Sequence, residues 1–549
     1  MPIITKTCIT SGKTFTVSEA EQKYCTERNI PLPQQHPFER LKHIANFRNR
    51  IHLYNTTCAK TQKPILSCFP PEKNYTVYDI EAWSGDRWEA TDYGQSYDSS
   101  RSFWDQYEEL LKKVPLPNLN VVSGTMENSN YVNGAMNLKN CYLCFSTLDS
   151  VDCMFCWATF NSQNIVNSIN CYFSEIAYEC RDIEKCYNCF YIESCQNCSD
   201  SYFLLGCQSC KHCYGCVNLN NREYCWYNEQ LSKDEYEKRL ASVNLGSIQV
   251  VGAERSTFKE FSKQFPTKYY RGKSIEKSDG NYISNCKDTH NAFFCTDCVD
   301  VENSLVLLKS KDCFGVVSSK ACELTYNSQS GMNYNCQYCN ESLVGNRNLA
   351  WCMFTNGSTD CFGCVSLKKK QYCILNKQYS PEEYFKLVAQ IKQAMIDRVE
   401  YEDFFPRRLS PFYYNESDSM IYFPATKEDA TKNGFSWKDE NAATSENHYI
   451  PPDDISAVTD DILQQTLVCV KTGKKYRLTK QELDFYRRFK IPVPRIAPLE
   501  RVNNFANQMF DIRELTIIAC SQCQKSLTSV YNPAQQQVLC EECYLQSTF

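Results

Sequence analysis

Small and apolar residues recur along the middle of this chain with a period of three, which is the period of neither an amphipathic helix nor an alternating strand. Between Cys141 and Cys225 there are fifteen cysteines, and every one stands at a position divisible by three. A second period lies on top: from Cys144 to Cys225 every ninth residue is a cysteine, except Ser162. Such regularity indicates an internal repeat.

The nine-residue units have a shared chemistry, as in CMFCWATFN, CYFSEIAYE, CRDIEKCYN and CQSCKHCYG. The ninth position is usually Asn, Gly or Glu, and Asn and Gly tolerate the left-handed backbone of a tight corner. Small residues at fixed phases would stack in columns inside a solenoid. We therefore predict a β-solenoid over about 126–225, with two of these units as the expected coil. A bundle of polyproline II segments also has a period of three and stays open.

The repeat indicates what most of its cysteines do. Ala177 and Leu204 occupy the phase that cysteine holds in other units, and neither can bind a metal. Free cysteine is a small, readily buried hydrophobe, so we expect a packed thiol core. A metal or iron–sulfur alternative remains for the densest cluster, Cys195 to Cys216. Disulfides are a further alternative for the cysteines of the repeat.

The repeat occurs twice. CVNLNNREYCWYNEQLSKDEYEK at residue 216 recurs as CVSLKKKQYCILNKQYSPEEYFK at residue 364. Capping boxes beginning at Ser232 and Ser380 predict a helix after each copy, over about 232–242 and 380–397.

The second copy breaks its own period once. Cys336 and Cys339 fall out of the phase kept by the cysteines on either side. We expect an insertion or a bulged coil near 331–340.

The two ends of the chain are copies of one module, as CITSGKTFTVSEAEQKYCTERNIPLPQQHPFERL at residue 8 matches CVKTGKKYRLTKQELDFYRRFKIPVPRIAPLERV at residue 469. The second copy ends in two Cys-x-x-Cys pairs, Cys520 with Cys523 and Cys540 with Cys543. Two such pairs at this separation favour a tetrahedral zinc site. Four thiols make a closed site, so we expect one structural zinc.

The first copy has lost part of this ligand set. The alignment places Cys58, Thr61, Asp79 and Ala82 opposite the four cysteines. Because two of these residues cannot bind a metal, we expect no zinc there.

A run of positive charge follows in the first copy, formed by Arg40, Lys42, Arg48 and Arg50. Such a run could contact phosphate, although a solvated helix face is its commoner meaning.

Composition narrows the class of protein. The chain has 549 residues, 35 cysteines and a net charge of −5, which argues against whole-molecule attraction to nucleic acid or anionic membrane. The sequence contains no apolar run long enough for a membrane span and no secretory signal, so we expect a cytoplasmic protein with reduced thiols. Common catalytic motifs are missing from the sequence. His212 is the best candidate partner for a cysteine nucleophile. We expect no enzymatic activity and identify no small-molecule substrate.

The predicted fold class is mainly β with helices: two tandem Cys-rich β-solenoids of nonapeptide period, flanked by duplicated zinc-ribbon-like α+β modules. A short amphipathic helix ended by Pro115 should cover the first coil. In chain order the predicted segments are a degenerate zinc-ribbon-like module (1–83), a helical cap or linker (84–125), the first solenoid (126–230), a helical connector (231–280), the second solenoid (281–376), a helix with an aromatic, proline-punctuated segment and an acidic linker (377–467), and the zinc-ribbon module (468–549).

Several stretches together resemble a family, the uncharacterised bacterial Cys-rich zinc-ribbon repeat proteins sometimes labelled "caib/baif family protein". The resemblance lies in NCYLCFSTLDSVDC, CYGCVNLNNREYC, FFPRRLSPFYYNES and YFPATKEDATKNGFSWKD, with the paired modules, and extends over nearly the whole chain. It implies two zinc ribbons, of which this chain has lost ligands in the first. It implies no established activity, and the label carries no coenzyme A chemistry to this chain.

The function expected from the sequence is that of a non-catalytic, zinc-binding repeat scaffold for macromolecular interaction, with a protein as partner. The alternative is a nucleic-acid- or ribosome-associated zinc-ribbon protein. A metal, iron–sulfur or thiol-redox role is the third possibility.

Overall fold

The computed structural model describes residues 3–342, 344–439, 449–509 and 512–548. The chain forms two compact units, each built from segments that are distant in sequence. Unit 1 comprises Met1–Leu119, Lys268–Lys438 and Ile512–Pro533, and unit 2 comprises Asn120–Thr267, Asp439–Asp511 and Ala534–Phe549. The first Cys-rich repeat therefore lies in unit 2 and the second in unit 1.

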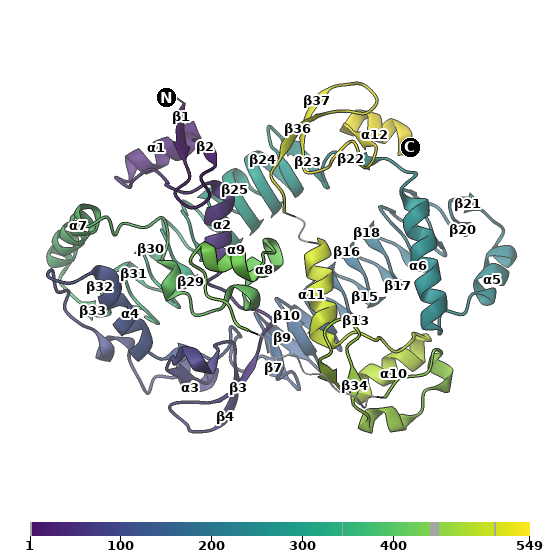
Figure 1. Ribbon diagram of the computed structural model, residues 1–549, viewed down its shortest axis with the longest axis horizontal. Helices are drawn as coiled ribbons and strands as arrows, with labels where there is room; N and C mark the ends of the chain where they lie inside the picture. Colours follow the sequence, from purple (N-terminus) through teal and green to yellow (C-terminus); the bar gives the residue numbers. More distant parts are fainter. Residues whose placement is uncertain (1–2, 343, 440–448, 510–511, 549) are drawn as a thin grey trace. The chain divides into compact units, whose positions relative to one another are not determined.

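The first repeat is one curled parallel sheet (Figure 1), in which the strands of residues 126–202 are paired in parallel. Its strands are β7 (Met126–Glu127), β8 (Val132–Asn133), β9 (Met136–Lys139), β10 (Tyr142–Phe145), β11 (Leu148–Val151), β12 (Met154–Phe160), β13 (Gln163–Val166), β14 (Ile169–Tyr172), β15 (Glu175–Tyr178), β16 (Arg181–Glu184), β17 (Tyr187–Phe190), β18 (Glu193–Gln196) and β19 (Ser199–Tyr202). Single parallel bridges continue the pattern to Trp226, and the hairpin of β20 (Cys225–Trp226) and β21 (Glu229–Gln230) ends it.

The predicted coil of two nonapeptide units is wrong, because paired residues are 12 apart. Cys144 pairs with Cys156, and Ile165 pairs with Ala177. Every third residue has a positive φ, as at Asn140 (53°) and Leu143 (49°), so each coil of 12 turns a corner after every three residues. One residue on each side between two corners points into the core. The inward-facing positions therefore recur every three residues, and the cysteines occupy these positions.

The nine-residue period has a different origin. The thiol of Cys144 donates a hydrogen bond to the carbonyl of Cys153 over 3.2 Å, and Cys156 does the same to Ile165 over 3.2 Å. Each coil has 12 residues and each of its sides has three. A residue nine positions further along therefore lies in the next coil, on the side adjacent to the one that holds the thiol.

Burial of the cysteines is confirmed. Cys180, Cys189, Cys198 and Cys207 are at most 1% exposed, and they belong to one core cluster with aliphatic residues such as Ile165, Ala177 and Leu204. Of all the cysteines, each of which lies in the described ranges, Cys523 alone is exposed.

The second repeat has the same 12-residue register, for example Val301 with Cys313. Its strands are β23 (Gly272–Glu276), β24 (Gly280–Thr296), β25 (Val299–Leu308), β26 (Lys311–Phe314), β27 (Val317–Lys320), β28 (Gln329–Ser330), β29 (Asn340–Ser342), β30 (Arg347–Ala350), β31 (Thr359–Phe362), β32 (Gln371–Ile374) and β33 (Lys377–Gln378).

The predicted irregularity near 331–340 is confirmed. Glu323 pairs with Tyr334, and Tyr334 pairs in turn with Arg347. The first of these steps is one residue shorter than a regular coil, and the second is one residue longer. A shortened coil is therefore followed by a lengthened one, which restores the phase.

Both predicted helices that follow the repeats are confirmed, as α5 (Lys233–Ser242) and α7 (Pro381–Asp397). The full capping box is present at Ser380 and Glu383, whereas at Ser232 the side chain accepts from the backbone N–H of Glu235. Helix α6 (Ile248–Ser262) occupies the predicted connector.

The helix that ends before Pro115 is α4 (Phe103–Lys113), and its predicted position is wrong. Instead of covering the first repeat, it packs on the last coils of the second. Phe103 lies 5.4 Å from Phe362 and Trp104 lies 5.8 Å from Trp351, measured between ring centroids. The aromatic residues of the second repeat provide these ring partners. The prediction placed α4 on the first repeat because the two are adjacent in sequence, and sequence adjacency does not show which repeat offers aromatic partners.

Both terminal modules consist of hairpins followed by short helices. The first contains β1 (Ile4–Thr7), β2 (Thr14–Val17), α1 (Glu19–Glu27), α2 (Pro37–Ala45), β3 (Tyr54–Thr57), β4 (Pro64–Ser67) and α3 (Ile80–Ser84). The second contains β34 (Leu467–Val468), β35 (Lys475–Tyr476), α10 (Lys480–Phe489), α11 (Pro498–Met509), β36 (Thr516–Ala519), β37 (Ser526–Ser529), β38 (Val538–Leu539) and α12 (Glu541–Thr548).

The remaining elements are short: β5 (Val77–Tyr78), β6 (Leu116–Pro117), β22 (Thr267–Lys268), α8 (Asp418–Tyr422) and α9 (Lys427–Lys432). Of the predicted acidic linker, residues 440–448 lie outside the described ranges, and the part that follows forms short 3-10 turns at Ile455–Ala457 and Asp460–Gln464. Among the helices of the described ranges, none combines the length and apolar character needed to cross a membrane.

Candidate metal centre

The hairpin of β36 and β37 holds the first cysteine pair. The N–H of Cys520 donates to the carbonyl of Lys525 over 2.9 Å, and the N–H of Gln524 donates back to the carbonyl of Cys520 over 3.0 Å. Gln524 has a φ of 63°, which closes the turn. The turn places residues 520 and 523 on the same side, as a metal-binding knuckle requires.

The second pair lies where β38 meets α12. Cys540 precedes the helix, and its sulfur accepts a hydrogen bond from the N–H of Cys543 over 3.5 Å. An N–H directed at a sulfur at a helix N-terminus favours the thiolate form.

The four sulfurs of Cys520, Cys523, Cys540 and Cys543 all lie within 4.8 Å of one another, and this group could hold a metal ion. Tetrahedral zinc–sulfur bonds of about 2.3 Å place sulfurs about 3.8 Å apart. The group therefore needs only a small contraction to enclose an ion, and an all-thiolate donor set fits zinc.

Within the described ranges the same turn occurs three more times, at Cys8, Cys58 and Cys469. In each the cysteine N–H donates to the carbonyl five residues on, over 2.8 Å, 2.9 Å and 2.9 Å respectively. The residue four positions on returns a bond to the cysteine carbonyl, over 3.0 Å, 2.9 Å and 2.9 Å. All four hairpins thus share the knuckle backbone, although the ligands differ.

In the Cys58 turn, hydrogen bonds replace ligands. The sulfur of Cys58 accepts from the N–H of Thr61 over 3.4 Å and from that of Asp79 over 3.3 Å. Burial would raise the pKa of this thiol, but the hydrogen bonds from Thr61, Asp79 and Lys60 outweigh it and lower the pKa. The Asp79 carboxylate instead caps α3, accepting from Glu81 and Ala82 over 2.9 Å each.

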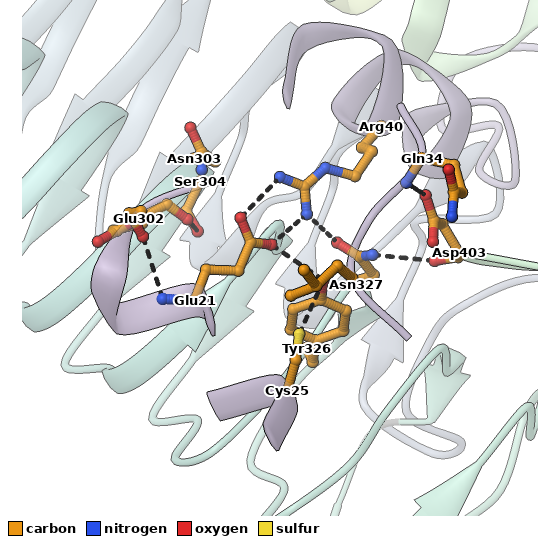
Figure 2. Close-up of polar contacts among 12 residues, drawn as sticks. Glu21, Cys25, Gln34, Arg40, Glu302, Asn303, Ser304, Tyr326, Asn327 and Asp403 are labelled. Atoms are coloured by element: carbon orange, nitrogen blue, oxygen red, sulfur yellow. Dashed lines mark hydrogen bonds and ion pairs between the residues drawn. The ribbon is translucent and has the colours of Figure 1, made fainter. Parts of the chain in front are cut away.

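The basic run does not form a solvated helix face, which corrects that interpretation of the sequence. Arg40 donates to the Glu21 carboxylate over 2.5 Å and 3.2 Å (Figure 2), and its side chain is 2% exposed. The sequence could not show this because the carboxylate partners of the three arginines come from other parts of the chain.

The neighbours of Arg40 in the run are also paired with carboxylates. Arg48 lies 2.8 Å from Glu341, Arg50 lies 2.9 Å from the buried Asp418, and Lys42 is paired with Glu39 over 2.9 Å. Arg40 and Arg50 are buried and Arg48 is 13% exposed, and each guanidinium is engaged with an acid of the same unit rather than free for phosphate.

The second module repeats the Arg40 arrangement. Arg501 donates to Glu482 over 2.8 Å and to the Tyr486 hydroxyl over 2.7 Å. The Glu and Arg stand at equivalent positions of the two copies, so the alignment contained the signal for this pair although sequence reasoning missed it. The pairs anchor the helices of their modules to each other rather than contacting a ligand.

The dense thiol cluster of the first repeat consists of hydrogen-bond donors. Cys198, Cys207 and Cys210 each donate to a carbonyl nine residues on, over 3.4–3.5 Å. Burial raises the pKa of the Cys195 thiol well above its ordinary value, so this thiol stays protonated. His212 is stacked on Tyr224 with 5.1 Å between ring centroids, a packing role.

The comparisons with known proteins do not assign a family. No protein-family model matches the chain, and no curated protein matches it.

Proposed function

We propose that this protein is a non-catalytic scaffold in which two β-solenoids carry zinc-ribbon-like modules and present flat surfaces to a protein partner. The observation that carries the proposal is the group of four cysteine sulfurs within 4.8 Å. A catalytic zinc keeps a position open for water or substrate, whereas four thiolates fill the tetrahedron. A closed site of this kind stabilises a module and leaves its outer surface for binding.

The solenoid assignment is supported by the 12-residue register and the corner at every third residue. Stacked coils of this kind present long, regular side faces.

A protein partner is favoured by apolar side chains that stay on the surface of the first repeat. Phe173 is 57% exposed and Tyr187 is 48% exposed. Aromatic residues contribute strongly to protein interfaces. Nucleic acid is the weaker alternative, because the arginines proposed to contact phosphate are engaged in ion pairs and two of them, Arg40 and Arg50, are buried.

Affinity capture from cells that produce the chain tests this function. The chain carrying F173S and Y187S is compared with wild type, and F385S on α7, where Phe385 is 56% exposed, is the matched surface control. Each capture is repeated with nuclease and at high salt. The proposal expects the same proteins after nuclease, their loss from the double variant and their retention by F385S. Partners that disappear with nuclease would instead establish the nucleic-acid alternative.

A further inference from the structure

The N-terminal helices pack on the second repeat through a buried polar network (Figure 2). The hydroxyl of Tyr326, from the repeat, donates to the Glu21 carboxylate over 2.9 Å. Asn327 accepts from Arg40 over 3.4 Å and donates to the backbone carbonyl of Asp403 over 3.0 Å. The network therefore joins α1, α2, the repeat and the segment after α7 within unit 1.

Two further carboxylates join this network. Glu302 on β25 accepts from the hydroxyl of Ser18, the residue that caps α1, over 2.5 Å. Asp403 accepts from the backbone N–H of Gln34 over 2.7 Å. With Glu21, three acids are gathered around the single guanidinium of Arg40. Three carboxylates and one guanidinium leave an excess of negative charge. Because unpaired charge is costly in a buried site, this excess favours protonation of a carboxylate.

The other ionisable groups that face Glu302 and Asp403 do not restore the balance. His290, next to Glu302, is already paired with Asp279 over 2.6 Å. Asp403 is further surrounded by groups that are neutral or acidic at pH 7: Cys25 on α1, Tyr338 of the repeat, and Tyr401 and Glu402 of its own segment. The Arg407 guanidinium interacts with the carboxylates of Glu39 and Glu402.

We propose that docking of α1 and α2 on the second repeat is a proton-dependent latch, in which the docked state binds a proton on Glu302 or Asp403 that the undocked state releases. This inference is independent of the proposed scaffold function.

The direction of the pH dependence follows from the environment of the two acids. Burial raises the pKa of Asp403, although Arg40 and the backbone of Gln34 act against it. Burial likewise raises the pKa of Glu302, and the hydrogen bond from Ser18 acts against it. A raised pKa in the docked state means that docking is strongest where both acids are protonated. It weakens as the pH rises above their ordinary values of 3.8 and 4.5 towards the raised ones.

The second module provides an internal reference. There Glu482, Tyr486 and Arg501 form a self-contained network with one carboxylate for one guanidinium. Since Tyr486 belongs to the same helix as Glu482, this network needs no residue of the repeat and has no surplus acid. Helix α10 should therefore lack the pH response of α1.

Hydrogen exchange of the full chain across a pH series, corrected for intrinsic exchange rates, tests the latch. The ratio of protection in α1 to that in α10 should fall with rising pH, by up to about tenfold per pH unit for one linked proton. E302Q and D403N should each reduce this slope. E323Q, at an exposed glutamate of the same repeat, should keep it.

The comparison of variants with wild type also removes the opposite contribution of His43 on α2, whose pKa is lowered by burial. An unchanged slope in both E302Q and D403N would overturn the latch, as would equal slopes for α1 and α10 in H43F, which lacks the opposing histidine. If D403N fails to fold, the H43F ratio and E302Q still decide the question.

Discussion

The backbone N–H of Asp79 donates a hydrogen bond to the sulfur of Cys58 over 3.3 Å. In the alignment of the two modules, Asp79 corresponds to Cys540 and Cys58 to Cys520. In the first module, the sulfur of Cys58 thus accepts a hydrogen bond from the N-terminus of α3. At the equivalent place in the last module, four cysteine sulfurs lie close together. We infer that this turn keeps its shape without a metal because N–H donors stabilise the sulfur.

The last module should bind about one zinc per chain, and C540S should abolish binding. Elemental analysis of the purified protein measures both, and a chelator should increase hydrogen exchange in the last module. C469S is the matched control, because Cys469 occupies the same kind of turn without a second pair. Zinc loss in C469S, or several metal ions per wild-type chain, would contradict the assignment.

Three substitutions in the first module should create a second site. The variant T61C/D79C/A82C completes a four-cysteine set on a knuckle backbone that already exists, so the zinc content should rise by about one per chain. T61S/D79N/A82S changes the same positions without adding thiols and should bind no more than wild type. An unchanged zinc content in the cysteine variant would show that the two turns are not equivalent.

The thiols of the repeat should be inert. Cys180, Cys189, Cys198 and Cys207 should react with an alkylating reagent only after denaturation, because each is buried. C189S should destabilise the chain by about 1–3 kcal/mol, since a hydroxyl is harder to bury than a thiol. A destabilisation near the low end of this range is expected for C189S, because the equivalent position of the next coil is already a serine, Ser201, which pairs with Cys189. Rapid native labelling would refute the packed core.

Removing the guanidinium of the second module should be costly. R501M leaves the Glu482 carboxylate buried without its cation and should destabilise unit 2 by about 3–5 kcal/mol. Chemical denaturation followed by fluorescence measures the change. R239M, which breaks an exposed pair with Glu235 on α5, should cost less than about 1 kcal/mol. Similar losses in both variants would show that burial does not decide the effect.

The contribution of His43 to the stability of unit 1 should fall in mild acid, opposite in sign to that of Glu302 and Asp403. This side chain is buried among Phe47, Phe404 and Phe435, and burial holds its pKa well below 6.5. The unfolded chain therefore takes up a proton below pH 6.5 that the folded chain rejects. This contribution should fall with falling pH by up to about 1.4 kcal/mol per pH unit. H43F should flatten this part of the stability–pH curve, and an unchanged slope would exclude His43 as the cause.

The sequence alone determined the features that depend on local geometry. Positions divisible by three identify the inward-facing residues because a corner at every third residue needs no information from elsewhere in the chain. The spacing of Cys520, Cys523, Cys540 and Cys543 indicated a four-sulfur group for the same reason, since a short hairpin and a helix start bring the two pairs together. The phase break at Cys336 likewise located the irregular coil.

The coil length, the partner of α4 and the environment of the basic run were decided only in the tertiary structure. A period of nine fits a coil of one or two repeat units, and strand pairing was needed to show that it is a diagonal within a coil of 12. Arg40 appeared basic and exposed because its acid partner is 19 residues away, and the acids opposite Arg48 and Arg50 are hundreds of residues away. Burial converts such charges from a surface property into an internal ion pair, and burial is set by which distant segments pack together.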